Sequence, residues 1–198
     1  MATSVDYVNR ALALLGAETI TALSYDDSPN AATAKDLYDP TVDELLMEWP
    51  WRFAVGRESL SQLTTTPLNT DFEYEYALPS DLLRIVATDI PDGQWMLYRD
   101  PESGYRRLYA NADSVMADMV RRPDDSLFPP HFQRALVHRL AMVLAMPVTR
   151  RADFFSLFAS MAASSIQQAK AQDWNEQPWL EMDDGNLIIN ARNGNTGS

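Results

Sequence analysis

The sequence contains no cysteine, which excludes disulfide bonds, thiolate metal ligands and a cysteine nucleophile. It also has no apolar run near the roughly 20 residues that a membrane-spanning helix requires. The first residues lack the basic segment and apolar run of a secretion signal, so none is expected. No glycine-rich phosphate loop and no GxSxG motif occurs. The 46% of apolar and 22% of charged residues are typical of a globular protein with a buried core.

Basic residues are scarce, with 16 lysines and arginines against 28 aspartates and glutamates. The net charge is therefore -12, and residues 1–50, with nine acids and two bases, contribute -7 of it. Residues 173–198, with five acids and one base, contribute a further -4. Because affinity for nucleic acid comes largely from cations that displace phosphate counterions, we expect no tight binding of DNA or RNA. The charge can serve solubility alone, or it can let DNA pass beside the surface without holding it.

Two histidines are present, His131 and His138, seven positions apart. No HExxH motif and no acid at ligand spacing accompanies them, so we expect structural histidines rather than metal ligands. Glu73 and Glu75 alternate with aromatic residues, which predicts that the two acids lie on a solvated face. The Asp-Asp-Gly-Asn segment at 183–186 is better explained as a hairpin turn than as a calcium loop. We therefore predict no catalytic site, no cofactor and no metal site, and a protein that is not an enzyme.

Apolar residues recur at helical spacing in two separate parts of the chain, residues 1–50 and 124–174. Before the first helix, Thr3 and Asp6 have the spacing of a capping box. In the second helix, Pro40 predicts a kink or a one-residue break. After Pro130 follows a run that is apolar nearly all round, which is typical of a central buried helix. Together these segments predict a bundle of about four helices.

Between the helical parts, residues 51–123 change to short runs rich in aromatic and β-branched residues. Turn signals such as the Pro-Asp-Gly segment at 91–93 separate these runs. Short strands joined by tight turns predict an antiparallel meander. The expected fold class is therefore α+β: mainly an α-helical bundle of about four helices, with an inserted antiparallel β-sheet and an extended C-terminal arm.

Residues 175–198 are mostly polar and contain a few large apolar side chains. This segment can form only a small pair of β-strands, and the stability of such a pair in water is marginal. The segment either folds back on its own domain or binds a partner chain by β-augmentation or groove insertion, and the sequence leaves both possibilities open. The side chains expected to contact a partner are Trp174, Trp179, Leu180, Leu187, Ile188 and Ile189.

Two blocks mark the expected joint between the helical layer and the inserted sheet, Glu48–Ala54 and Tyr76–Arg84. Together with the opening segment Val8–Gly16, they resemble the tail tubular protein A family, the head-to-tail adaptors of short-tailed phages. The resemblance covers about residues 3–172 and depends on structural motifs rather than on reactive residues. The residues expected to build the joint are Trp49, Trp51, Phe53, Tyr76, Pro79 and Asp81.

The resemblance implies a dodecameric ring between the portal and the tail nozzle, at the head-tail interface of a virion assembled in the bacterial cytoplasm. It implies the portal protein, a nozzle similar to tail tubular protein B, tail fibres and further copies of this chain as partners. DNA would pass through the ring without specific binding, and no membrane would be involved. C-terminal segments of related adaptors clasp the portal. This fits residues 175–198 as an extended arm whose apolar side chains contact the portal.

The alternative is a tail-associated hydrolase of polysaccharide or cell wall. In that case paired carboxylates such as Glu73 and Glu75 would act as general acid and base.

Overall fold

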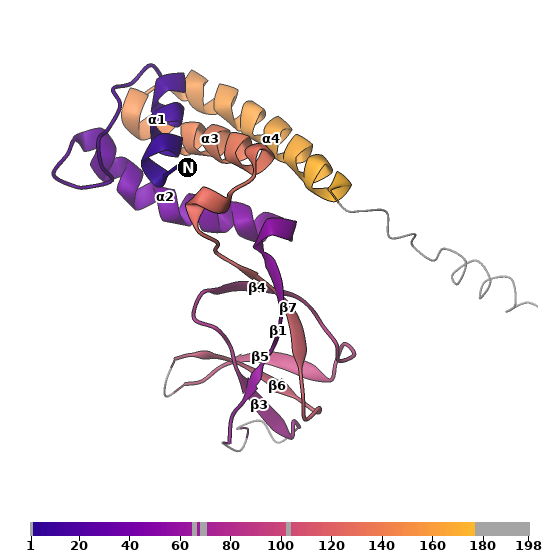
Figure 1. Cartoon of the computed structure of the whole chain (residues 1–198). Coiled ribbons are helices and arrows are strands. Elements are labelled where there is room, and N and C mark those ends of the chain that lie inside the picture. The colour runs from indigo at the N-terminus through magenta and orange to yellow at the C-terminus, as the bar shows by residue number, and fades with distance from the viewer. Residues whose placement is uncertain (1, 65–66, 68–70, 102–103, 177–198) are drawn as a thin grey trace, which may run out of the picture.

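The computed structural model describes residues 2–64, 67, 71–101 and 104–176. Within these residues the chain forms four α-helices and seven β-strands, which confirms the α+β fold class (Figure 1). The helices are α1 (Ser4–Leu14), α2 (Pro29–Glu48), α3 (Pro130–Leu144) and α4 (Ala152–Asn175). The strands are β1 (Val55–Ser59), β2 (Ser61–Gln62), β3 (Tyr74–Ala77), β4 (Leu82–Thr88), β5 (Trp95–Arg99), β6 (Arg106–Ala110) and β7 (Met116–Arg121).

The starts of α1 and α2 follow the local signals in the sequence. Thr3 and Asp6 form the predicted capping box, in which each side chain binds the backbone N–H of the other residue. Ser28 caps α2 by accepting a hydrogen bond from the backbone of Ala31. The expected break at Pro40 does not occur, because α2 continues from Pro29 to Glu48 with this proline inside it.

The helical layer is built around α3, which packs against α1, α2 and α4. One face of each outer helix contributes to a single apolar core, as the 3–4 spacing of apolar residues predicted. Between α3 and α4 lies a five-residue π-helical segment, Ala145–Thr149, followed by Arg150 in the left-handed conformation. The turn lets α4 run back along α3 over its length. None of the described helices is long and apolar enough to cross a membrane.

The strands form two antiparallel sheets rather than one, with the orders β1-β7-β4 and β2-β3-β6-β5. The chain passes from the first sheet to the second at Leu60, between β1 and β2, where its side chain is buried. Both sheets contribute to a second apolar core, separate from that of the helices. Two register shifts in β4 bend that strand along its partner β7. The side chains of this second core are Leu60, Tyr76, Leu82, Leu108, Ala110, Val115, Ala117 and Met119.

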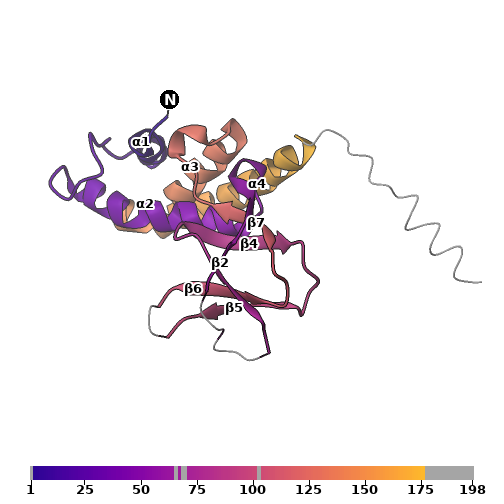
Figure 2. The same cartoon turned by 60° about the horizontal axis from the view of Figure 1, so that its bottom comes forward.

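The two sheets lie together at one side of the helical layer, below α2 and α3 in the view of Figure 1. Figure 2 shows the same arrangement from a direction in which the sheets come forward. The chain enters the sheets through a short 3-10 turn, Arg52–Ala54, and returns to α3 through a second one, Asp125–Leu127. All seven strands fall within the expected insertion 51–123, and the four α-helices lie on either side of it.

Candidate functional site

An aromatic cluster forms the joint between helices and sheets. Trp51 is fully buried, and its indole nitrogen donates a hydrogen bond of 2.7 Å to the backbone carbonyl of Leu45 in α2. Its ring meets Phe132 edge-on at 5.1 Å, and Phe53 meets Phe132 at 4.9 Å. Phe128 stacks obliquely on the same Phe132 ring at 4.8 Å. The residues that lead into the sheets and those that lead out of them therefore share one core.

Asp173, near the end of α4, connects this joint to the last helix. Its carboxylate accepts hydrogen bonds of 3.1 Å from the indole nitrogen of Trp49 and from the backbone N–H of Arg52. The aspartate is 1% exposed. Both donors belong to the turn between α2 and the first strand, where backbone N–H groups lack helical partners. One carboxylate thus holds α4 against the start of the sheets.

Three of the residues expected at the joint lie elsewhere. Tyr76 is buried in the core of the sheets, where its hydroxyl donates a hydrogen bond of 2.6 Å to the carbonyl of Ala112. Pro79 and Asp81 form the turn before β4, and Asp81 lies 3.8 Å from the guanidinium of Arg121 at the end of β7. The structure therefore brings together Trp49, Trp51 and Phe53 but separates them from Tyr76, Pro79 and Asp81.

Arg122, just after β7, binds α2 through several acids. Its guanidinium lies 2.7 Å from Asp39, 3.2 Å from Asp43 and 3.7 Å from Asp125. Burial alone would lower the pKa of Arg122, but the hydrogen bond to Asp39 and the neighbouring negative charges outweigh it and raise the pKa. Asp125 also accepts a hydrogen bond of 2.8 Å from the hydroxyl of Tyr38. Burial and this bond raise the pKa of Tyr38 strongly, so the phenol stays neutral.

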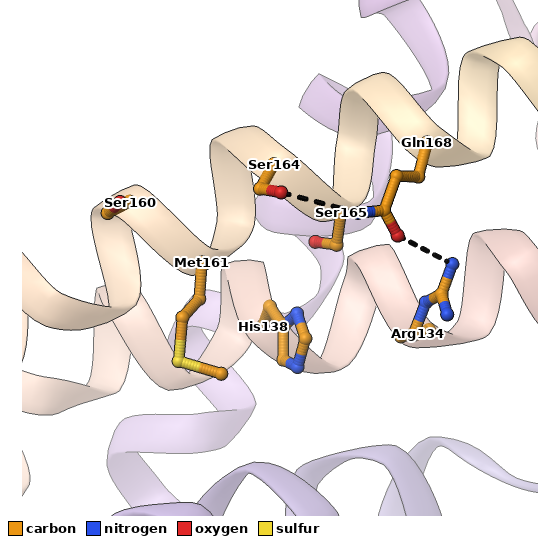
Figure 3. Close-up of a pocket in the computed structure, with 7 residues that line it drawn as sticks. All are labelled: Arg134, His138, Ser160, Met161, Ser164, Ser165 and Gln168. Carbon is orange, nitrogen blue, oxygen red and sulfur yellow. Dashed lines mark hydrogen bonds between the residues drawn. The ribbon is translucent and has the colours of Figure 1, made fainter.

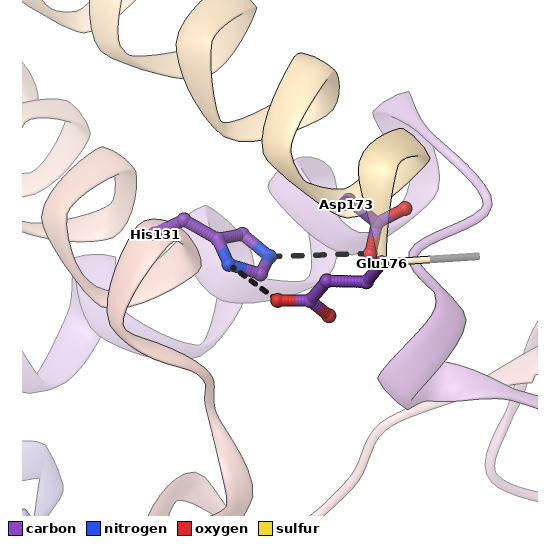
Figure 4. A group of neighbouring side chains, drawn as sticks. All are labelled: His131, Asp173 and Glu176. Carbon is purple, nitrogen blue, oxygen red and sulfur yellow. Dashed lines mark ion pairs between the residues drawn. The ribbon is translucent and has the colours of Figure 1, made fainter. Parts of the chain in front are cut away.

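His131, in the first turn of α3, faces one acid in the last turn of α4 and another at the C-cap of that helix (Figure 4). Its Nε2 lies 3.9 Å from Asp173 Oδ1, and its Nδ1 lies 3.5 Å from Glu176 Oε1. The imidazole is buried and stacks on the indole of Trp51 at 6.3 Å. One ligand atom from each of the three residues can be chosen so that all lie within 4.8 Å of one another. The sequence analysis missed this group because the acids lie more than forty positions from the histidine.

A shallow pocket of about 330 Å³ opens between α3 and α4 around His138 (Figure 3). Gln168 connects its two sides, because it accepts a hydrogen bond of 3.2 Å from Arg134 and donates one of 3.4 Å to Ser164. Burial, together with the charge of Arg134, lowers the pKa of His138, so this imidazole is neutral at pH 7. The lining side chains are Arg134, His138, Ser160, Met161, Ser164, Ser165 and Gln168.

The solvent-facing side of α4 carries no charge over most of its length. From Phe154 to Ala169 every residue is uncharged, a stretch of about 24 Å along a helix. Protein interfaces are depleted of charged residues at their centres. The exposed side of α4 shares this lack of charge. Its exposed side chains are Phe155, Ser156, Leu157, Ser160, Ala163, Ser164, Gln167 and Gln168.

Of the residues expected to bind a partner, Trp174 lies within the described residues. It is 56% exposed at the end of α4, and the guanidinium carbon of Arg52 lies 5.9 Å from its ring. This is a distance at which a cation–π interaction forms. Trp179, Leu180, Leu187, Ile188 and Ile189 lie outside the described residues.

The two acids considered for hydrolysis have different surroundings. Glu73 is exposed and precedes β3, whereas Glu75 lies within β3 and is 7% exposed. The expectation that Glu75 lies on a solvated face is therefore wrong. Arg107 on the neighbouring strand β6 lies 3.4 Å from its carboxylate. Glu75 lies directly opposite Tyr109 of β6, whose buried ring packs with Phe72 and Tyr98. Aromatic side chains thus cover the face of β3 opposite Tyr76 as well, which is why alternation alone misplaced the acid.

No protein-family model matches the chain, and no curated protein matches it.

Proposed function

We propose that this protein is a structural head-to-tail adaptor of a short-tailed phage. In this proposal, copies of the chain form a ring, dodecameric by the resemblance, between the portal and the tail nozzle. The ring continues the DNA channel, and its location is the head-tail interface of the virion. The chain acts by offering complementary surfaces to its neighbours rather than by catalysis.

The observation that carries this proposal is the joint. The chain leaves the helical layer at Trp49–Ala54 and returns to it at Phe128, and both segments share one aromatic core. A two-sheet module therefore projects from a helical layer at a fixed position. This is the order of elements, and the placement of the aromatic motif, that the resemblance to tail tubular protein A implies.

The uncharged side of α4 supports the ring. In a chain of net charge -12, contact between identical copies is opposed by mutual repulsion wherever acids meet. A helix face without charge avoids that repulsion, and its serine and alanine side chains allow close approach of a neighbouring element. The acids elsewhere on the molecule would repel DNA phosphates, which suits a channel through which DNA slides.

Electron microscopy of portal rings mixed with the purified full-length protein tests the proposal. The expected result is one additional ring layer below the portal, with the same rotational order in every particle. A variant that ends at Glu176 should dock more weakly if residues 177–198 clasp the portal, and its melting temperature, compared with that of the full chain, checks that it folds. Portal rings that gain no layer at micromolar protein would overturn the adaptor function. Normal docking of the shortened chain would overturn the role of the arm alone.

The hydrolase alternative is tested on the same preparation. Release of reducing sugar from cell-wall polysaccharide, abolished in a Glu73→Gln or Glu75→Gln variant, would replace the adaptor proposal. Activity that is the same in both variants would come from another source.

A further inference from the structure

We propose that His131, Asp173 and Glu176 form a binding site for a divalent transition-metal ion of the Zn²⁺ class. The site is independent of the adaptor function, because it depends on the described contacts of this chain alone. It joins the first turn of α3 to the last turn of α4, at the joint between helices and sheets (Figure 4).

The first argument is an unsatisfied nitrogen. His131 Nε2 is buried and has no hydrogen-bond partner among the described residues, and the side chain is 5% exposed. Buried polar atoms usually have a partner. Several buried side-chain nitrogen atoms of the described residues make no hydrogen bond, and among these His131 Nε2 is the atom that belongs to a group of three possible metal ligands. This nitrogen points to Asp173 Oδ1 at 3.9 Å, which is too far for a hydrogen bond.

The second argument is an uncompensated charge. Asp173 is buried, and among the described residues no lysine or arginine pairs with its carboxylate. Its two hydrogen bonds come from neutral donors, Trp49 and the backbone of Arg52. Buried charges are normally paired or bind metal ions. A cation between Asp173 and His131 would satisfy the carboxylate and the nitrogen together.

The geometry fits a metal ion better than a shared proton. An imidazolium bound to a carboxylate brings N and O to about 2.8 Å, well inside the observed separation. Zinc binds histidine nitrogen and carboxylate oxygen at about 2.0–2.2 Å each, so a tetrahedral ion between them places the two atoms about 3.4 Å apart. The observed 3.9 Å therefore needs an approach of roughly half an ångström.

The surroundings of the ligands also match those of a metal site. The hydrogen bonds from Trp49 and Arg52 fix the orientation of the Asp173 carboxylate, as outer-shell partners of metal ligands do. The indole of Trp51 packs on the imidazole and supplies an apolar wall. Glu176 is 58% exposed, so its side chain can close over an ion that enters from solvent. Asp173 lies in the last turn of α4 and Glu176 is its C-cap residue, so both acids are at the helix C-terminus, where the helix dipole favours a cation.

The ligand set selects the class of metal. One imidazole and two carboxylates suit Zn²⁺ and its first-row neighbours. Calcium requires six to eight oxygen ligands, and magnesium keeps most of its water, so neither is matched by this set. Binding would fix the end of α4 relative to the start of the sheets, because Asp173 also accepts hydrogen bonds from Trp49 and Arg52.

Isothermal titration calorimetry of untagged, EDTA-treated full-length protein with ZnCl₂ tests the site. We expect one Zn²⁺ per chain and a rise in melting temperature of about 5–10 °C at a metal concentration near a hundred times Kd. His131→Gln should abolish this binding. His138→Gln is the matched control, because it removes the other histidine of the same helix and should bind Zn²⁺ as the parent does. Substitution of CaCl₂ or MgCl₂ for zinc should give no comparable heat.

Glu176→Gln keeps the test decisive if His131→Gln does not fold. This residue is exposed, so its replacement leaves the fold intact but should weaken zinc binding about tenfold or more. Equal binding by the parent, His131→Gln and Glu176→Gln would overturn the proposal. An absence of zinc binding by the parent would also overturn the proposal. This includes the outcome in which the melting temperature of the parent changes with pH near neutrality but does not change when zinc is added.

Discussion

The indole nitrogen of Trp49 donates a hydrogen bond of 3.1 Å to the carboxylate of Asp173, 124 positions later in the chain. This bond joins the C-cap residue of α2 to the last helix, and the backbone of Arg52 adds a second bond to the same acid. The helical layer is thus closed at its sheet side by one buried side chain. The first prediction follows from this relationship.

Replacing Asp173 with alanine should destabilise the protein by roughly 1–3 kcal/mol, because two partly buried donors lose their acceptor. Urea unfolding followed by tryptophan fluorescence measures the change. Gln172→Ala, one position earlier and exposed, is the control and should leave the free energy of unfolding within about 0.5 kcal/mol of the parent. Equal stability of Asp173→Ala and the parent would contradict the assigned role.

Trp51 should be the most sensitive aromatic residue of the joint. Its replacement by alanine removes a fully buried side chain and should cost about 3–5 kcal/mol. Trp51→Phe keeps part of the volume but leaves the carbonyl of Leu45 without its donor, so a smaller loss of about 1–3 kcal/mol is expected. Differential scanning calorimetry measures both. Trp174→Phe changes an exposed tryptophan and serves as the control. If its loss of stability were as large as that of Trp51→Phe, the greater sensitivity assigned to Trp51 would be contradicted.

Arg122 should contribute more to stability than an ordinary surface arginine. It meets three aspartates and is 25% exposed, so Arg122→Ala should cost about 1–3 kcal/mol by leaving partly buried acids uncompensated. Arg57→Ala is the matched control, since Arg57 is 59% exposed and lies 3.9 Å from a single acid, Asp118. Its loss should stay below about 1 kcal/mol in the same urea titration. If the two variants lose equal free energy of unfolding, the three aspartates around Arg122 stabilise the fold no more than an ordinary surface ion pair does.

Acid should destabilise the fold through hydrogen-bonded aspartates. The pKa of Asp27 lies below 3.8 because the hydroxyl and backbone N–H of Thr21 donate hydrogen bonds to it, and the pKa of Asp6 is lowered by the backbone and hydroxyl of Thr3. A folded-state pKa below the unfolded value contributes stability above the unfolded value, and that contribution is lost as pH falls through the folded value. The melting temperature should therefore fall below pH of about 4. Asp27→Asn should flatten this dependence, whereas an unchanged slope would contradict it.

Ring assembly should respond to charge on α4. Ala163 is exposed in the middle of the uncharged side of this helix, so Ala163→Glu should prevent addition of a ring layer to the portal without lowering the melting temperature. Gln94→Glu, at an exposed position just before β5, adds the same negative charge and should assemble normally. Electron microscopy of the two variants with portal rings separates the outcomes. Normal assembly of Ala163→Glu would remove α4 from the interface.

The local signals in the sequence determined the fold class. Helical periodicity with caps at Thr3 and Ser28 placed the helices, and short β-branched and aromatic runs between turn signals placed the strands, because each pattern is written within a few neighbouring residues. Trp51 and Phe53 were likewise identifiable as structural residues, because large aromatic side chains at a helix-to-strand turn usually pack in the core. At Pro40 the sequence predicted a kink or a one-residue break, and the structure excludes the break, since α2 continues through this residue.

Only the tertiary structure decided how the strands divide into two sheets, and with it the burial of Glu75 beside Arg107. The same is true of the meeting of His131 with Asp173 and Glu176, and of the bond between Trp49 and Asp173. These relationships join residues that are tens of positions apart and have no periodic pattern in common. Which of these residues come into contact depends on how the two apolar cores pack. That packing depends on the whole chain rather than on any one segment.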